Sequence, residues 1–193
     1  MSIFKKLLIT LMLLLAAADG WYFLYWQNTP AFAAGEIQQA VQKKDWNLFC
    51  KRVDVAKVYS YALDDMLAEL KADGLPEHAI AASLVKSIKK EVVKELIRQT
   101  ESRFKDGAPA SKSLLDKPIK TLTAYAGSSA LSLTDIFKIE EKDGKAIAYV
   151  QLEDKDLSRD FIWQVQLEKD VNGLWTATRI LNFTDYLKER MDG

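Results

Sequence analysis

The chain has 193 residues, with 27 basic and 27 acidic side chains, so its formal net charge at neutral pH is zero. This balance produces no strong electrostatic field and argues against a nucleic-acid or polyanionic partner. A single cysteine excludes an internal disulfide, and a single histidine leaves too few imidazole and thiolate ligands for a zinc site.

A long apolar segment lies near the N-terminus. Lys5 and Lys6 precede a mostly apolar run from Leu7 to Trp26. As a helix, a run of this length rises roughly 30 Å, about the thickness of the hydrocarbon core of a bilayer. The two lysines favour a cytoplasmic N-terminus and an exported body. We therefore expect residues 1–28 to form a single-pass anchor in the cell membrane, with the lipid bilayer as the partner of residues 7–26.

Asp19 leaves alternatives to this anchor open. A carboxylate at the centre of a membrane helix costs about 2.5–3.5 kcal/mol on insertion scales. Asp19 could be protonated, could pair with the helix of another chain, or could belong to a signal peptide that is removed. Residues 16–18 and 31–33 offer small side chains at which a signal peptidase cuts. The aromatic block Trp21–Trp26 favours an uncleaved anchor, because it extends the apolar run to a full span.

The residue pattern in the first half of the exported part predicts helices. Thr29-Pro30 is expected to break the first helix, with a linker over residues 29–35 and a single domain over 36–193. A helix is predicted over about 35–44. Asp45 and Asp54 look like N-caps of the next two helices, since each aspartate directly precedes a new apolar face.

Longer helical patterns continue to residue 126. The helix after Asp54 is expected to end at Asp73-Gly74, where glycine allows a left-handed turn. Pro76 suits the first turn of a helix that reaches about Lys105, with this seam of apolar residues: Ile80, Leu84, Ile88, Val92 and Leu96. A loop region with one short helix at about 118–126 follows.

From residue 133 to 183 the apolar period drops to two. Alternating residues flank Asp143-Gly144, which is typical of a tight hairpin turn. Further alternation around a turn at Asp170–Gly173 predicts a four-stranded antiparallel meander, and a short helix is expected over 184–190. The predicted fold class is therefore α+β: an N-terminal transmembrane helix, then a helical half over 36–126 packed on a C-terminal sheet over 133–183.

One pattern near the anchor resembles a known family. Its residues are Thr29-Pro30, Ile37, Ala40-Val41, Asp45, Phe49 and Val53-Asp54. The pattern, TP…I..A(I/V)…D…F…VD, is similar to that of small bacterial membrane-anchored or exported proteins grouped as a domain of unknown function. The resemblance implies a bacterial origin and an anchor, and it implies no activity or catalytic residues. More weakly, the helices followed by a meander resemble cystatin-like α+β rolls, from which the long helix over 76–105 departs.

The sequence offers no catalytic residues, cofactor-binding motif or metal site. His78 follows Pro76 and is expected at the surface in the first turn of a helix. Cys50, beside Phe49, is expected to be a small buried residue rather than a reactive thiol. The paired carboxylates Asp64-Asp65, Glu140-Glu141 and Asp154 with Asp156 are interpreted as solvated surface, because neighbouring residues point in different directions.

Basic residues recur along the long helix predicted over 76–105: Lys86, Lys89, Lys90, Lys94 and Arg98. We call these five residues the basic stripe. One hypothesis is contact with anionic lipid head groups or wall polymers. The alternative, which we favour, is a solvated face whose charges are relieved by nearby acids, with Glu91, Glu95 and Glu101 within reach of the basic residues three or four positions later.

These observations predict a non-enzymatic, membrane-anchored protein of the bacterial cell envelope with an extracytoplasmic binding or scaffolding domain. A further envelope protein is a candidate partner. The alternative is a secreted or periplasmic protein, released by signal-peptide cleavage, that binds a small apolar ligand between sheet and helices. An enzyme that uses carboxylates or tyrosines in such a pocket is the third hypothesis.

Overall fold

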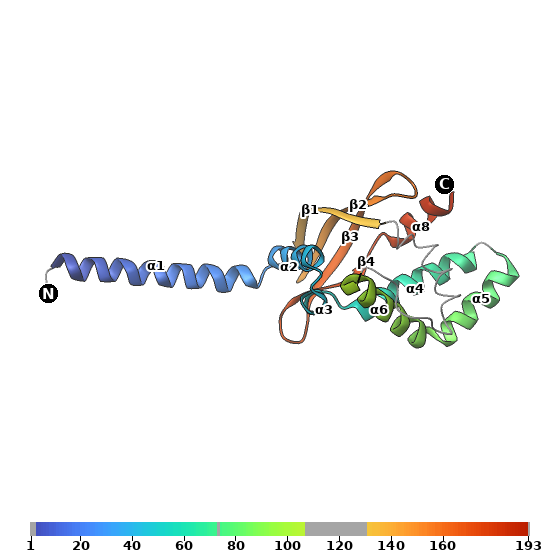
Figure 1. Ribbon diagram of the computed structural model, residues 1–193, viewed down its shortest axis with the longest axis horizontal. Coiled ribbons are helices and arrows are strands. Elements are labelled where there is room, and N and C mark those ends of the chain that lie inside the picture. Colours follow the sequence, from blue (N-terminus) through green and yellow to red (C-terminus); the bar gives the residue numbers. More distant parts are fainter. Residues whose placement is uncertain (1–2, 73, 107–130, 193) are drawn as a thin grey trace.

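A computed structural model of the chain describes residues 3–72, 74–106 and 131–192. The fold is α+β: helices come first, and a four-stranded antiparallel sheet and a last helix follow. One long helix projects as a rod from a body that contains all the other elements (Figure 1). The short helix predicted over 118–126 lies outside the described residues.

The rod is α1 (Ile3–Gln27), a helix of 25 residues without a single buried side chain. At 1.5 Å per residue its length is roughly 37 Å. Within the described part of the chain it is the helix that is long and apolar enough to cross a membrane, although a signal sequence has the same character. The predicted apolar helix is therefore confirmed.

The second helix, α2 (Pro30–Lys43), starts almost directly after the first. Thr29 caps it: its hydroxyl accepts a hydrogen bond from the amide of Phe32 at 3.2 Å, and Pro30 takes the first helical position, where no N–H is needed. The structure thus differs from the expected linker over 29–35. Only Asn28 and Thr29 separate the two helices, because the cap and the proline start a helix where we expected an irregular segment.

Two aspartates cap the next helices as predicted. The Asp45 carboxylate accepts from the amide of Leu48 at the start of α3 (Trp46–Arg52). The Asp54 carboxylate accepts from the amide of Lys57 at the start of α4 (Val55–Ala72). Between these helices the amide of Asp54 donates to the carbonyl of Ala177, 2.9 Å away, so the corner is fastened to the edge of the sheet.

The single helix predicted over 76–105 is wrong. The structure has two helices, α5 (Pro76–Ser87) and α6 (Lys89–Asp106), separated at Ile88, whose φ of −111° and ψ of 23° are not helical. The hydroxyl of Ser87 bonds to the carbonyl of Leu84 and competes with the backbone there. The predicted seam is divided in consequence: Val92 is fully buried, whereas Ile80 and Leu84 are each 63% exposed.

The predicted meander is confirmed. Its strands are β1 (Leu131–Lys142), β2 (Lys145–Asp154), β3 (Arg159–Lys169) and β4 (Trp175–Ile180), and α8 (Phe183–Asp192) follows them. Asp143 and Gly144 both have positive φ, as the tight turn between β1 and β2 requires. At the β3–β4 turn the amide of Gly173 donates to the carbonyl of Asp170.

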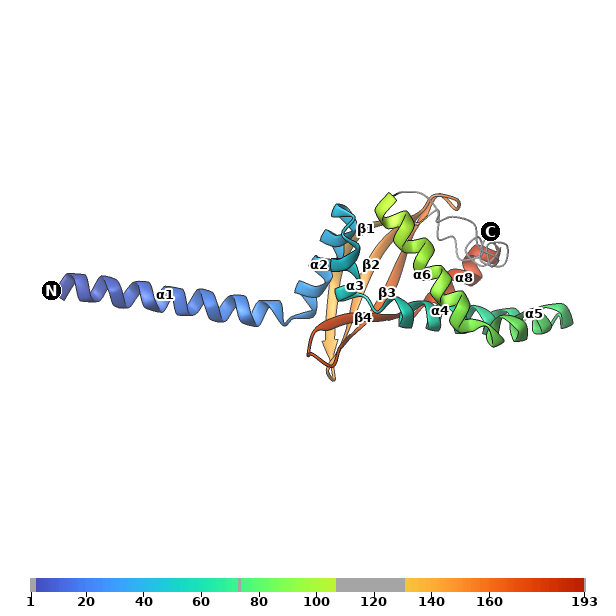
Figure 2. The same cartoon turned by 60° about the horizontal axis from the view of Figure 1, so that its bottom comes forward.

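One face of the sheet carries the core. Alternate residues of β2 are buried against the helices: Ala146, Ala148, Val150 and Leu152. Trp46 and Val55 join this cluster from the helical half. A second cluster gathers residues of α4, α5, α6 and α8 around Leu63, Val92 and Leu187. Seen from the side, α2, α3 and α6 lie over the same face of the sheet (Figure 2).

Candidate functional site

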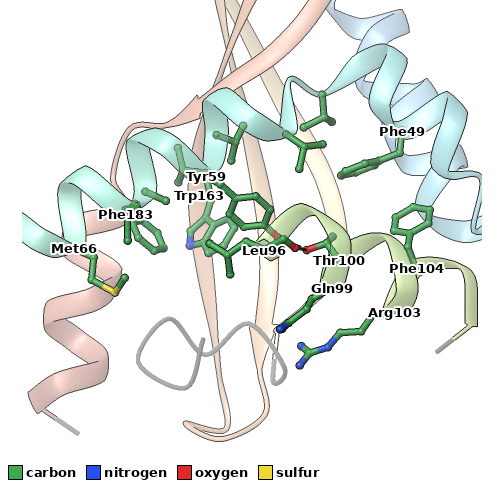
Figure 3. A pocket seen from close by; sticks show the side chains of 16 residues that line it. Phe49, Tyr59, Met66, Leu96, Gln99, Thr100, Arg103, Phe104, Trp163 and Phe183 are labelled. Atoms are coloured by element: carbon green, nitrogen blue, oxygen red, sulfur yellow. Dashed lines mark hydrogen bonds between the residues drawn. The ribbon is translucent and has the colours of Figure 1, made fainter. Parts of the chain in front are cut away.

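A cavity of about 500 Å³ lies where α3, α4 and α6 approach the sheet and the start of α8. Most of its wall consists of aliphatic and aromatic side chains. Figure 3 shows Phe49 and Phe104 at one end and Met66 and Phe183 at the other, with Trp163 of β3 between them. Its size falls within the range of roughly 300–1,000 Å³ typical of ligand sites.

The corner between α3 and α4 opens this space. Because that corner is fastened to β4, α4 leaves the sheet at its edge, and α6 crosses over the gap with Leu96 and Thr100 directed inwards (Figure 3). The aromatic rings of Trp46, Phe49 and Phe104 pack together at the α3 end, with centroids between 5.0 and 5.7 Å apart. Phe49 and Phe104 line that end of the cavity, and Trp46 packs behind them.

One hydrogen-bonded pair of polar side chains faces the cavity. The hydroxyls of Tyr59 and Thr100 are 2.5 Å apart, and Thr100 also donates to the carbonyl of Leu96 at 2.8 Å. Thr100 has one proton, so Tyr59 must be the donor within the pair. Burial raises the pKa of the Tyr59 hydroxyl above its ordinary value. The pair is therefore satisfied and neutral, and it offers no ready acid or base.

Arg103 is the charged residue of the wall. Its side chain and that of Gln99, one helical turn earlier on α6, extend in the same direction at one edge of the cavity (Figure 3). Among the described residues nothing forms an ion pair or a hydrogen bond with the guanidinium of Arg103. Gln99 donates to the carboxylate of Glu95 at 3.2 Å, and Glu95 also binds Arg98. Arg103 is thus a half-buried cation beside an apolar space, without an ionic partner among the described residues.

Trp163 lines the middle of the cavity and packs edge-to-face against Phe183 and Tyr186, with centroids 6.2 and 5.6 Å away. Its indole nitrogen is buried and has no hydrogen-bond partner within the described part of the chain. A buried donor without an acceptor costs stability unless something else satisfies it. Trp163 therefore places one buried donor without a described acceptor beside the cavity.

The structure does not bring the basic stripe together as one surface. Lys86 lies on α5, and the break at Ile88 separates it from the other four residues on α6. Lys89 pairs with Asp64 at 2.7 Å and Arg98 pairs with Glu95 at 2.5 Å, while Lys90 and Lys94 are exposed. These pairs agree with relief by nearby acids. Contact with anionic surfaces stays a prediction, and none of the five residues lines the cavity.

The remaining candidates lie elsewhere. His78 is in the first turn of α5, as expected, and does not line the cavity. Cys50 is exposed, so the prediction that it is buried is wrong: it faces away from the core on α3, beside Phe49, which takes the inward position. The part of the chain that the structure describes contains no group of three or more metal-ligating side chains.

Asp154 corrects another expectation. It was grouped with solvated carboxylates, yet its side chain is fully buried. Its carboxylate accepts hydrogen bonds from the Tyr186 hydroxyl at 2.8 Å and from the Arg190 guanidinium at 2.5 Å. Burial by itself raises the pKa of this carboxyl, but these hydrogen bonds outweigh burial and hold the pKa below its usual range. The network fastens the β2–β3 hairpin to α8.

The sequence analysis considered an apolar ligand site between sheet and helices but named none of the residues that line the cavity, although one signal was present. The apolar seam through Val92 and Leu96 continues, at the same helical spacing, with Thr100 and Arg103. Polar side chains on the inward face of a helix need a partner or a space to face. Here both residues line the cavity.

Comparisons with known proteins identify no relative. No protein-family model matches the chain. Neither the curated proteins nor the solved structures include a significant match. The resemblances drawn from the sequence therefore stay predictions, and the class of protein defined here is an α+β body with an apolar cavity, joined to a long apolar helix.

Proposed function

We propose that this protein is a non-enzymatic, single-pass, membrane-anchored protein of the bacterial cell envelope, whose extracytoplasmic domain binds a small apolar molecule in its cavity. The cavity between α3, α4, α6 and the sheet is the observation that carries this proposal. The proposal joins the expected anchor with the ligand-binding role considered for a released protein.

The wall chemistry supports binding rather than catalysis. Among the described residues that line the cavity, none is a carboxylate, a histidine or a cysteine. The Tyr59 hydroxyl is engaged with Thr100 and its pKa is raised, so it is poorly suited to give or take a proton near neutral pH. The apolar side chains can displace water in favour of an apolar molecule, which is the main source of affinity in such sites.

The junction between α1 and the body supports an anchor that stays attached. The indole N–H of Trp175, at the start of β4, donates to the carbonyl of Asn28 at 2.9 Å. Trp175 is 1% exposed, so the residue just after α1 is held by the core of the body. Cleavage after Ala18 would cut within α1, and cleavage after Ala33 would remove the start of α2 with its cap.

The first test concerns the anchor. Cells that express the full chain are fractionated, and the mass of the mature protein is measured. We expect the full-length mass in the membrane fraction, and a reporter fused to the C-terminus should be active only outside the cytoplasm. A soluble product that begins at Asp19 or Ala34, or a reporter active inside the cell, would contradict the anchored topology.

The second test concerns the cavity. The full chain in lipid nanodiscs is treated with a small neutral photoactivatable diazirine, and the labelled peptides are mapped. We expect labels on α4 and α6 residues that line the cavity, and their loss in Ala62→Trp, because the indole fills the space. The matched control is Ala68→Trp on the exposed side of α4, which should keep the labels. Equal labelling in both variants would refute binding in the cavity.

A further inference from the structure

We infer that the molecule taken up by the cavity is an amphiphile with one long apolar chain and an anionic head group, a carboxylate or a phosphate ester. This inference rests on the proposed function, because it names the class of ligand for the same cavity. Arg103 receives the head group, and the space between Tyr59, Trp163 and Phe183 receives the chain.

The charge of Arg103 sets the sign of the head group. A guanidinium offers a planar fork of N–H donors that matches a carboxylate or phosphate with two parallel hydrogen bonds. The described residues provide Arg103 with no such partner. Glu95, earlier on α6, is already engaged with Arg98 and Gln99. An anionic head group would therefore give Arg103 a charged acceptor that the described residues do not provide.

A neutral or cationic ligand fits this site less well. A ligand that fills the cavity displaces water from the inward side of the Arg103 side chain. Removing water from a cation without supplying a partner is costly, and a second cation would also be repelled. An anionic head group repays this cost, and the amide of Gln99, which extends beside Arg103, adds a polar neighbour at the same edge (Figure 3).

The rest of the wall suits a hydrocarbon chain. From the Arg103 edge the lining continues past Tyr59 and Trp163 to Met66 and Phe183, and the Tyr59–Thr100 pair satisfies its own hydrogen bonds (Figure 3). A polar ligand body would find few partners there. A chain gains affinity with each buried methylene, roughly fourfold per group. A membrane anchor would also keep the body beside a bilayer, which is a reservoir of such molecules.

The test compares three probes that differ only in the head group. Full-length protein in nanodiscs is photolabelled with diazirine derivatives of hexadecanoic acid, hexadecylamine and hexadecanol, and labels on cavity residues are normalised to labels on α1. We expect the acid to label the cavity roughly tenfold more than the amine. In Arg103→Met, which keeps the apolar stem, this preference should disappear. Arg103→Lys should retain part of it.

Lys94→Met is the matched control, since it removes an exposed charge from the same helix outside the cavity, and it should keep the preference for the acid. Equal labelling by acid and amine in the wild type would overturn the anionic ligand and leave the proposed function standing. A preference that survives in Arg103→Met would overturn the role of Arg103. Absence of cavity labels from all three probes would overturn both this inference and the proposed function.

Discussion

At the scale of single residues, the buried charged side chains have partners that the local sequence does not indicate. The burial of Asp154 could not be predicted, because its partners Tyr186 and Arg190 lie 32 and 36 positions later in the sequence. Arg52 is similar: it is 2% exposed and binds Glu36, 16 positions earlier. Local pattern does not reveal pairs that only the tertiary fold brings together. The inward polar residues Thr100 and Arg103 differ, because their helical spacing from Val92 and Leu96 was a local signal.

Asp154→Asn should destabilise the body by roughly 3–5 kcal/mol, because it removes the negative charge that pairs with Arg190 and replaces one acceptor oxygen of a buried network with an NH2 donor. The neighbouring Asp156→Asn should cost about 1 kcal/mol or less, since Asp156 is 58% exposed although it binds the same arginine. Urea unfolding of the full-length variants in detergent measures both. Equal losses would show that burial of Asp154 does not control the energy.

The same carboxylate predicts how stability depends on pH. Its pKa is lowered in the folded protein, so the unfolded chain binds more protons and the stability contributed by Asp154 falls with falling pH. That contribution is complete above the unfolded pKa of about 3.9 and is lost as the pH falls through the lower folded value. Unfolding curves of wild type and Asp154→Asn should therefore converge in acid. A constant difference down to the lowest pH would contradict the prediction.

At the scale of elements, local signals located the boundaries that local chemistry determines. Asp45, Asp54 and the Asp143-Gly144 turn act through their own neighbouring backbone groups, and the structure confirms all three. At Ile88 the local competition from Ser87 is joined by tertiary packing, since the break lets Ala82 of α5 and Val92 of α6 both join the core cluster with α4. A continuous helical period in the sequence contains no information about that third helix, so the predicted seam was too long.

The divided seam makes a prediction about two leucines of the helical half. Leu84→Ala on α5 should change the free energy of unfolding by less than about 0.5 kcal/mol, because Leu84 is largely exposed. Leu67→Ala on α4 should cost about 2–5 kcal/mol, because Leu67 is 5% exposed in the core. Thermal unfolding of the full chain compares the two. A large loss in Leu84→Ala would mean that the side chain is covered in solution.

At the scale of the whole molecule, the junction between α1 and the body is the feature that sequence reasoning described least well. We expected a linker over residues 29–35, and the structure has two connecting residues, one of them bonded to Trp175. Trp175 lies 147 positions after Asn28, so no local pattern could predict the contact. The general architecture was predictable, because apolar length and the change from helical to alternating period are properties of whole segments.

This junction can be tested with spin labels. Cys50 is exposed and is the single cysteine of the chain, so it takes one label directly, and Leu24→Cys on α1 takes the second. Trp175→Phe removes the N–H that bonds to Asn28, and we expect a broader distribution of label-to-label distances. Trp21→Phe, on the exposed surface of α1, is the control and should leave the distribution narrow. Identical distributions in both variants would show that the hydrogen bond does not hold the junction.

The short junction has a consequence for how the body meets other molecules. If α1 lies in a bilayer, the connection of two residues keeps the body close to the membrane surface. It also restricts how far the body can tilt relative to α1. The body then moves with α1, by lateral diffusion in the plane of the membrane and by rotation about the membrane normal. The protein would therefore encounter a lipid-derived ligand by lateral diffusion in the membrane. The concentration of that ligand in the bilayer does not change when the surrounding solution is diluted.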